Sequence, residues 1–127
     1  MSRYLILPFI RTALSRGKSV EQFLGGFTHD DEAALRWVEI CPEPGGVTLV
    51  LHQVYDEGEE GCLDLYEFTP ASDDPDEADE PAAEHHLATL EEAIALAGKL
   101  YGAHADRFVN EGVIQDEYGD YLARRGG

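Results

Sequence analysis

The sequence predicts an α+β fold, in which a mostly antiparallel sheet carries two to four helices packed on one face. The sheet is expected to be a three-stranded meander plus one or two further strands. Three observations support this prediction: extended apolar runs separated by short turns, later stretches with the 3.6-residue period of a helix, and a hydrophobic content of 43% in 127 residues. A chain of this length is expected to form a single domain over residues 1–127 with one substantial core.

The first quarter of the chain is expected to contain one strand and two short helices. Residues 3–7 contain good strand formers and are followed by a proline, and residues 9–16 have apolar side chains at helical spacing. Ser19 and Gln22 stand three residues apart, as in an N-terminal capping box. This spacing predicts a short helix after Ser19, ended by the two glycines at 25–26.

Three extended runs follow, over residues 35–41, 47–55 and 62–68. The turns between them are five and six residues long and rich in glycine, proline and acidic residues, which favours an antiparallel meander. In the second run, one face is expected to carry Val47, Leu49 and Leu51, and the other Val50 and Val54. A short fourth strand is expected over residues 84–88.

The clearest helical pattern begins at Thr89, which forms a capping box with Glu92. Apolar residues recur at helical spacing up to residue 101, and Gly102 stands where a left-handed glycine commonly ends a helix. Residues 113–125 show the same period and predict a last helix, and residues 107–109 form one further candidate strand.

The charge of the chain lies in its middle half. The stretch 37–98 contains no lysine or arginine but 17 of the 26 acidic residues, and the formal net charge is −17. Such a surface repels phosphate, so binding to nucleic acid or to an anionic membrane is not expected. Within this stretch, residues 69–83 contain three prolines and a run of Asp and Glu. They are expected to form a mobile acidic linker.

No motif for catalysis, a metal or a cofactor is found, so no catalytic residue, metal ligand or cofactor is predicted. The sequence favours a protein that is not an enzyme but leaves catalysis open. Cys41 and Cys62 fall short of a disulfide framework and are interpreted as small buried hydrophobic residues, which fits a cytoplasmic protein with reduced thiols. His85 and His86 are adjacent in an expected strand, where neighbouring side chains point to opposite faces, so a shared metal site is disfavoured.

The predicted binding site combines aromatic side chains with the acidic stretch. Aromatic anchors inside a charged rim are typical of protein-binding surfaces. The candidate binding residues are Trp37, Asp56, Glu57, Glu59, Glu60, Tyr118 and Tyr121. The alternative, that most of these aromatic residues belong to the core, remains open.

The function predicted from these features is that of a non-catalytic acidic protein that docks a basic protein partner, of the immunity or inhibitor type. Two alternatives remain. One is a soluble bacterial accessory domain whose acidity reflects solubility or adaptation to high salt. The other is an enzyme with an unrecognised site, which a deep pocket containing Asp30, His52 or Glu117 with perturbed titration would favour.

Overall fold

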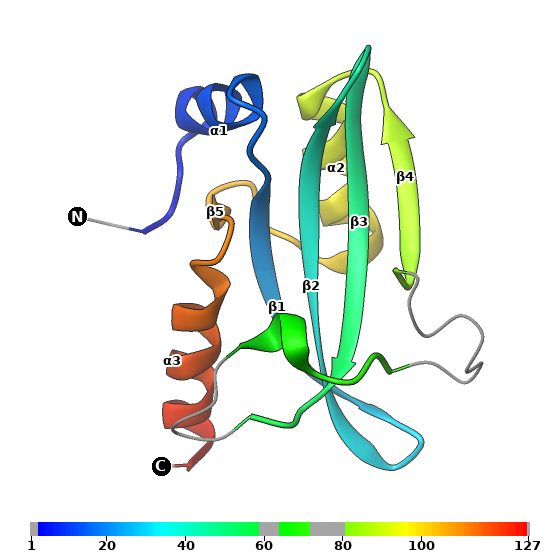
Figure 1. Ribbon diagram of the computed structural model, residues 1–127, viewed down its shortest axis with the longest axis vertical. Helices are drawn as coiled ribbons and strands as arrows, with labels where there is room; N and C mark the ends of the chain where they lie inside the picture. Colours follow the sequence, from blue (N-terminus) through cyan, green and yellow to red (C-terminus); the bar gives the residue numbers. More distant parts are fainter. Residues whose placement is uncertain (1–2, 59–63, 72–80, 127) are drawn as a thin grey trace.

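Five strands form one antiparallel sheet in the order β4-β3-β2-β1-β5 (Figure 1). The computed structural model describes residues 3–58, 64–71 and 81–126. In chain order the elements are α1 (Leu7–Ser15), β1 (Val20–His29), β2 (Glu32–Glu43), β3 (Gly46–Tyr55), the 3₁₀ turn η1 (Leu65–Glu67), β4 (Ala83–Leu87), α2 (Leu90–Tyr101), β5 (Val109–Asn110) and α3 (Ile114–Gly126). The predicted α+β class, with a mostly antiparallel sheet and two to four helices, is confirmed.

The meander begins one strand earlier than predicted, because the segment after Ser19 is a strand and not a helix. Gln22 does not cap a helix. Its side chain instead donates to the carbonyl of His104 at 2.7 Å and accepts from the backbone N–H of His104 at 2.8 Å. Gly25 has φ +101° and lies where the β1–β2 register shifts, so it bends a strand at a bulge. The sequence prediction of a capped helix is wrong here because a tertiary contact uses the same side chain.

The tight turn between β1 and β2 consists of Asp30 and Asp31. Both have positive φ, at 50° and 66°, which is the conformation that a two-residue hairpin turn needs. Aspartate tolerates this region better than most residues with a side chain. The polar stretch therefore joins two long strands instead of separating a helix from a sheet.

The predicted strand over residues 62–68 is also not found. Residues 62 and 63 lie outside the described part of the chain, and Leu65–Glu67 forms a 3₁₀ turn. The Asp64 side chain accepts from the backbone N–H of Tyr66 at 3.2 Å, which caps the turn. Leu65 and Phe68 are buried, so this segment packs on the sheet instead of extending it.

The three helices begin and end near the predicted residues, except at the N-terminus. The strand predicted over residues 3–7 is wrong: α1 begins at Leu7 and holds Pro8 in its first turn, where the missing N–H has no intrahelical partner to lose. In α2 the Thr89 side chain accepts from the backbone N–H of Glu92 at 3.2 Å, and Gly102 has φ +73°, as the sequence predicts.

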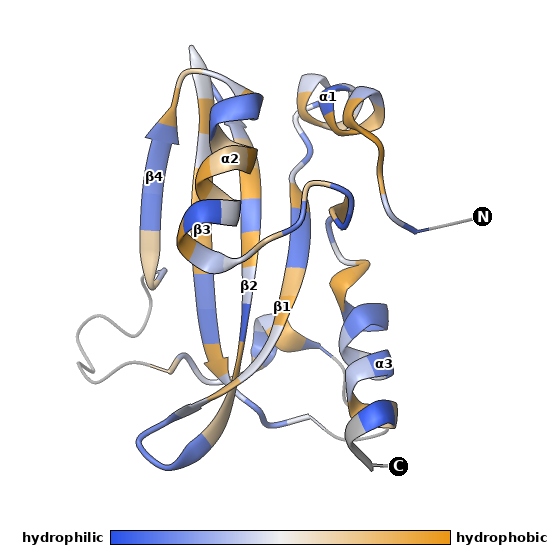
Figure 2. Ribbon diagram, turned by 180° about the vertical axis from the view of Figure 1, so that it is seen from behind, coloured by the Kyte–Doolittle hydropathy of each residue, from blue (hydrophilic) through white to orange (hydrophobic). Residues whose placement is uncertain are grey.

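Two buried clusters lie on opposite faces of the sheet. Neighbouring residues of β2 point to opposite faces, so Val38 belongs to a cluster with α1 and α2, and Trp37 to a cluster with α3 and η1. Figures 1 and 2 show α2 across β2 and β3 on one side and η1 on the other. The expectation that the helices pack on one face is therefore not confirmed.

Both ends of the predicted linker are paired with β3. Thr69 accepts from the N–H of Tyr55 at 2.8 Å, Ala71 donates to Gln53 at 3.0 Å, and Ala82 donates to Leu51 at 2.9 Å. These bonds cover the edge of β3 beyond β4. Residues 72–80 of the predicted linker lie outside the described residues. Among the helices of the described chain, none is long and apolar enough to cross a membrane.

Candidate functional site

A cavity of about 390 Å³ lies on the face of the sheet opposite α2. Its floor is built by β1, β2 and β3, which supply Glu21, Trp37, Glu39 and His52. Its walls come from segments that are distant in sequence, namely Tyr66 and Phe68 in and after η1, Pro70 and Pro81 beside β3, and Glu111 before α3. The volume lies within the usual range for pockets that bind small molecules or protruding side chains.

The strand register brings the polar floor together. Glu21 and Glu39 are direct cross-strand partners on β1 and β2, and Trp37 and His52 are direct partners on β2 and β3. Because strand side chains alternate with period two, Trp37 and Glu39 share a face. Four polar or aromatic side chains from three strands therefore face one cavity.

Glu21 is a buried carboxylate, with only 2% of its surface exposed. Its Oε1 accepts from the Tyr66 hydroxyl at 2.6 Å and from the backbone N–H of Gly112 at 2.9 Å. Burial raises the pKa of Glu21, because the charged form has lost most of its hydration, although these two hydrogen bonds oppose the shift. The ionised carboxylate is therefore poorly compensated, which favours a cation beside it.

Glu39 is the second carboxylate of the floor and is ionised. The hydrogen bond from His52 Nε2 to Glu39 Oε1, at 2.8 Å, is the main reason why the pKa of Glu39 is lowered to about 2. The same interaction fixes His52, whose ring stacks on Trp37 with centroids 4.8 Å apart and planes 21° from parallel. Glu39 thus holds a negative charge in the cavity at any pH near neutrality.

Trp37 is 2% exposed, and its indole Nε1–H has no acceptor among the described residues. A buried donor left without an acceptor costs about 1–3 kcal/mol. Trp37 is also the single tryptophan of the chain, so its fluorescence reports on this cavity.

The cavity is negative. Glu21, Glu39 and Glu111 line it, and none of its lining residues, all within the described ranges, is a lysine or arginine. The low local dielectric of a partly enclosed site strengthens the attraction of these carboxylates for a cation.

The predicted binding residues do not form one exposed patch. Tyr118 is fully buried and donates a hydrogen bond to Asp56, and Glu57 accepts from both the backbone N–H and the hydroxyl of Thr69. Tyr121 is half-buried and packs edge-on against Phe23, with centroids 5.5 Å apart. These contacts hold loops and α3 in place.

Of the predicted residues, Trp37 lines the cavity, and Glu59 and Glu60 lie outside the described part of the chain. Sequence reasoning missed Glu21 altogether. It considered Tyr66 only as one of several aromatic residues near the acidic stretch, and it named His52 only as a candidate for catalysis. Glu21 can be placed beside Glu39 only through the pairing of β1 with β2. The sequence prediction had a helix in place of β1, so this pairing could not be foreseen.

Cys41 is half-buried on β2, and its thiol is not a nucleophile at neutral pH. Burial raises the pKa of Cys41 to about 12, and the neighbouring carboxylate of Glu39 adds to this shift. Cys62 lies outside the described residues. Across residues 3–58, 64–71 and 81–126, no group of three or more His, Cys, Asp or Glu side chains is placed to hold a metal ion.

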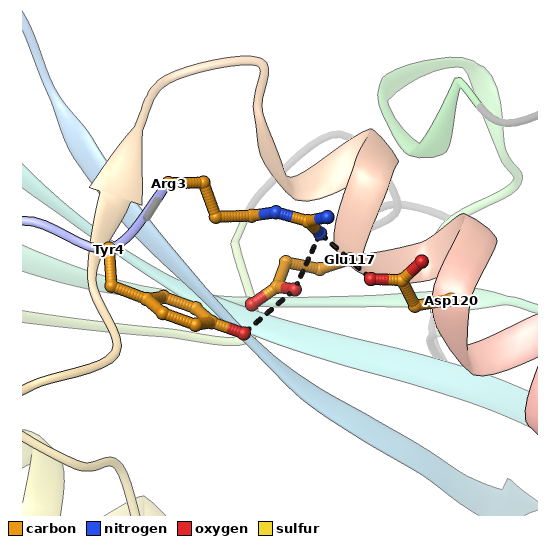
Figure 3. A network of polar contacts seen from close by, with 4 residues as sticks. All are labelled: Arg3, Tyr4, Glu117 and Asp120. Carbon is orange, nitrogen blue, oxygen red and sulfur yellow. Dashed lines mark hydrogen bonds and ion pairs between the residues drawn. The ribbon is translucent and has the colours of Figure 1, made fainter. Parts of the chain in front are cut away.

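The carboxylate of Glu117, considered above as a catalytic candidate, takes part in a structural network (Figure 3). Arg3 Nη1 donates to Glu117 at 2.9 Å and to Asp120 at 3.0 Å, and the Tyr4 hydroxyl donates to Glu117 at 3.1 Å. This network fastens the N-terminal segment to α3 and lies outside the cavity.

The fold and the cavity together define an α+β protein with a five-stranded antiparallel sheet and an acidic, aromatic-lined pocket on one face. Comparison with family models, with curated proteins and with solved structures gives no match for this chain.

Proposed function

We propose that this protein is a non-catalytic binding protein that docks a basic protein partner, of the immunity or inhibitor type, and that the cavity is its anchoring site. The observation that carries the proposal is the pair of carboxylates, Glu21 and Glu39, side by side on the floor of an aromatic-lined pocket. A buried carboxylate with a raised pKa gains most when a cation enters and compensates its charge.

The net charge of −17 supports the same proposal. A strongly negative molecule attracts a positively charged partner over a distance of about one Debye length, roughly 8 Å at physiological salt, and this attraction raises the association rate. Long-range attraction does not fix where the partner binds. The cavity provides a defined binding site for one side chain of the partner. Binding is expected to weaken as salt is added, through a slower association rate.

An enzyme is the second candidate, and one observation favours it. His52 is oriented by a carboxylate at 2.8 Å, an arrangement that general bases use. However, the thiol on this face, Cys41, is held in its neutral form, so covalent catalysis through it is disfavoured. If the protein were an enzyme using this base, His52→Gln would remove its activity.

The test is partner capture with matched baits. The protein and its Glu39→Gln variant are immobilised and exposed to lysate of the source cells at low salt. The control is Glu92→Gln, which makes the same charge change at an exposed residue of α2. A basic protein retained by the unmodified and control baits, released by salt and lost with Glu39→Gln, is the expected result. Equal retention by all three baits contradicts the proposed site.

A further inference from the structure

We propose that the cavity receives an arginine side chain from the partner, with its guanidinium against Glu21 and Glu39. This inference rests on the proposed function and deepens it by naming the group that enters the site. It draws on the cross-strand pairing of the two carboxylates, on the burial of Glu21, and on the lack of lysine and arginine among the lining residues.

The two carboxylates lie on residues that are direct cross-strand partners. Cross-strand partners have Cβ atoms roughly 4.5–5.5 Å apart, so one ligand group can lie between both side chains. Oε1 of Glu21 already accepts two hydrogen bonds, whereas Oε2 receives none from the described residues. A guanidinium presents five N–H donors in a fixed plane and can reach both carboxylates at once. A lysine ammonium is a single point charge and bonds them less completely.

Burial also favours arginine over lysine. A cation that reaches Glu21, which is 2% exposed, must leave most of its water behind. Guanidinium is more weakly hydrated than ammonium, so it loses less on entering. Its flat faces also stack on aromatic rings, and Tyr66 offers one at the cavity wall, with 47% of its surface exposed.

The arginine belongs to a polypeptide because the proposed function is the docking of a basic protein. A protein partner is also what the net charge of −17 attracts over a distance. The cavity then receives one arginine of that partner.

The experiment titrates the protein with three blocked pentapeptides, Gly-Gly-Xaa-Gly-Gly, in which Xaa is arginine, lysine or citrulline. Trp37 fluorescence reports binding, since it is the single tryptophan and lines the cavity. Citrulline has nearly the shape of arginine but no charge. The arginine peptide is expected to give a saturable change with a Kd about tenfold or more below that of the lysine peptide, and citrulline to give none. Methylguanidine, which lacks the peptide chain and its contacts with the cavity wall, is expected to bind more weakly than the arginine peptide.

Variants locate the site and keep the proposal falsifiable. Glu21→Gln and Glu39→Gln are each expected to weaken binding of the arginine peptide about tenfold or more, and Glu92→Gln to leave it unchanged. Circular dichroism shows whether each variant is folded. The Glu92→Gln control makes the same change of charge, so a loss confined to the two floor variants belongs to the cavity.

The outcomes separate this inference from the proposed function. Equal affinity for the lysine and arginine peptides overturns guanidinium selection and leaves cation docking in place. If the citrulline peptide binds as tightly as the arginine peptide, both guanidinium selection and cation docking are wrong, because charge is then irrelevant. Methylguanidine binding as tightly as the arginine peptide overturns the polypeptide assignment. If none of the probes changes Trp37 fluorescence, arginine insertion is wrong, and partner capture alone decides the function.

Discussion

The two faces of the sheet are built by alternating residues of the same strands, and they differ in what they bury. On the face covered by α1 and α2, the central strands place Val20, Val38, Ile40, Leu49 and Leu51 in one apolar cluster. On the other face, neighbouring positions carry Glu21, Trp37, Glu39 and His52 around a cavity. A single backbone thus carries an apolar core on one side, and on the other side a second apolar cluster with a polar site beside it.

This difference separates residues that stabilise the fold from residues that lower its stability. Burying an aliphatic side chain stabilises a fold by roughly 1.5–3 kcal/mol, whereas an unpaired buried polar group costs about 1–3 kcal/mol. The floor of the cavity contains a carboxylate with a raised pKa and an orphan indole N–H, neither of which favours folding. A carboxylate with a perturbed pKa is typical of a functional site.

The largest effect on stability is expected on the apolar face. Leu49→Ala removes a fully buried side chain, and the lost burial and the resulting cavity should lower the free energy of unfolding by about 2–5 kcal/mol. Urea unfolding measures this change. The control Leu100→Ala, at an exposed position of α2, should change it by only about 0.5 kcal/mol or less. Loss of arginine-peptide binding in folded Leu49→Ala protein would show that the two faces are not separate.

Glu39→Gln should have the next largest effect. The lowered pKa of Glu39 means that its ionised form stabilises the fold, by about 1–2 kcal/mol at pH 7 once solvent screening of this partly exposed pair is allowed for. Because the folded pKa is depressed, this contribution is present above pH 4.5 and disappears as the pH falls towards 2. Urea unfolding of both proteins at several pH values tests the sign. A difference that grows on acidification argues against the Glu39–His52 interaction.

Tyr66→Phe should destabilise the fold by about 0.5–1.5 kcal/mol, because Glu21 loses one of its two described donors. The ring still packs at the cavity wall, so binding of the arginine peptide should fall much less than in Glu21→Gln. Thermal unfolding and the fluorescence titration provide the two readouts. If Tyr66→Phe removed binding entirely, the hydroxyl itself would be the ligand contact.

Glu21→Gln should have the smallest effect on stability. Unlike the other variants, it should stabilise the fold at neutral pH. Because burial raises the folded pKa of Glu21, its contribution is favourable below pH 4.5 and is lost as the pH rises through the raised value. The original protein should therefore lose stability relative to the variant as the pH rises from 4.5. Parallel pH series of urea unfolding measure this trend, and a variant that becomes relatively less stable at higher pH would refute it.

The sequence pattern predicted an element correctly where interactions between residues close in the chain decide its structure. The Thr89 cap and Gly102 give α2, and the apolar run of residues 47–55 gives β3 with the faces expected for Leu49 and Val54. The same reasoning failed for β1, because Gln22 satisfies the backbone of His104, which is distant in sequence. The site was missed for the same reason. Charge density pointed to the stretch 37–98, whereas Glu21 lies outside it and meets Glu39 only through strand pairing.

The most direct test of the account is proton release on binding. Arginine peptide is titrated calorimetrically in two buffers of different ionisation enthalpy, just above pH 4.5, the ordinary pKa of a glutamate. A guanidinium beside Glu21 lowers the pKa of that carboxyl group, so binding should release protons, and Glu21→Gln should abolish the release. Binding without proton exchange, or with the same exchange in Glu21→Gln, would place the arginine away from Glu21 and contradict the account.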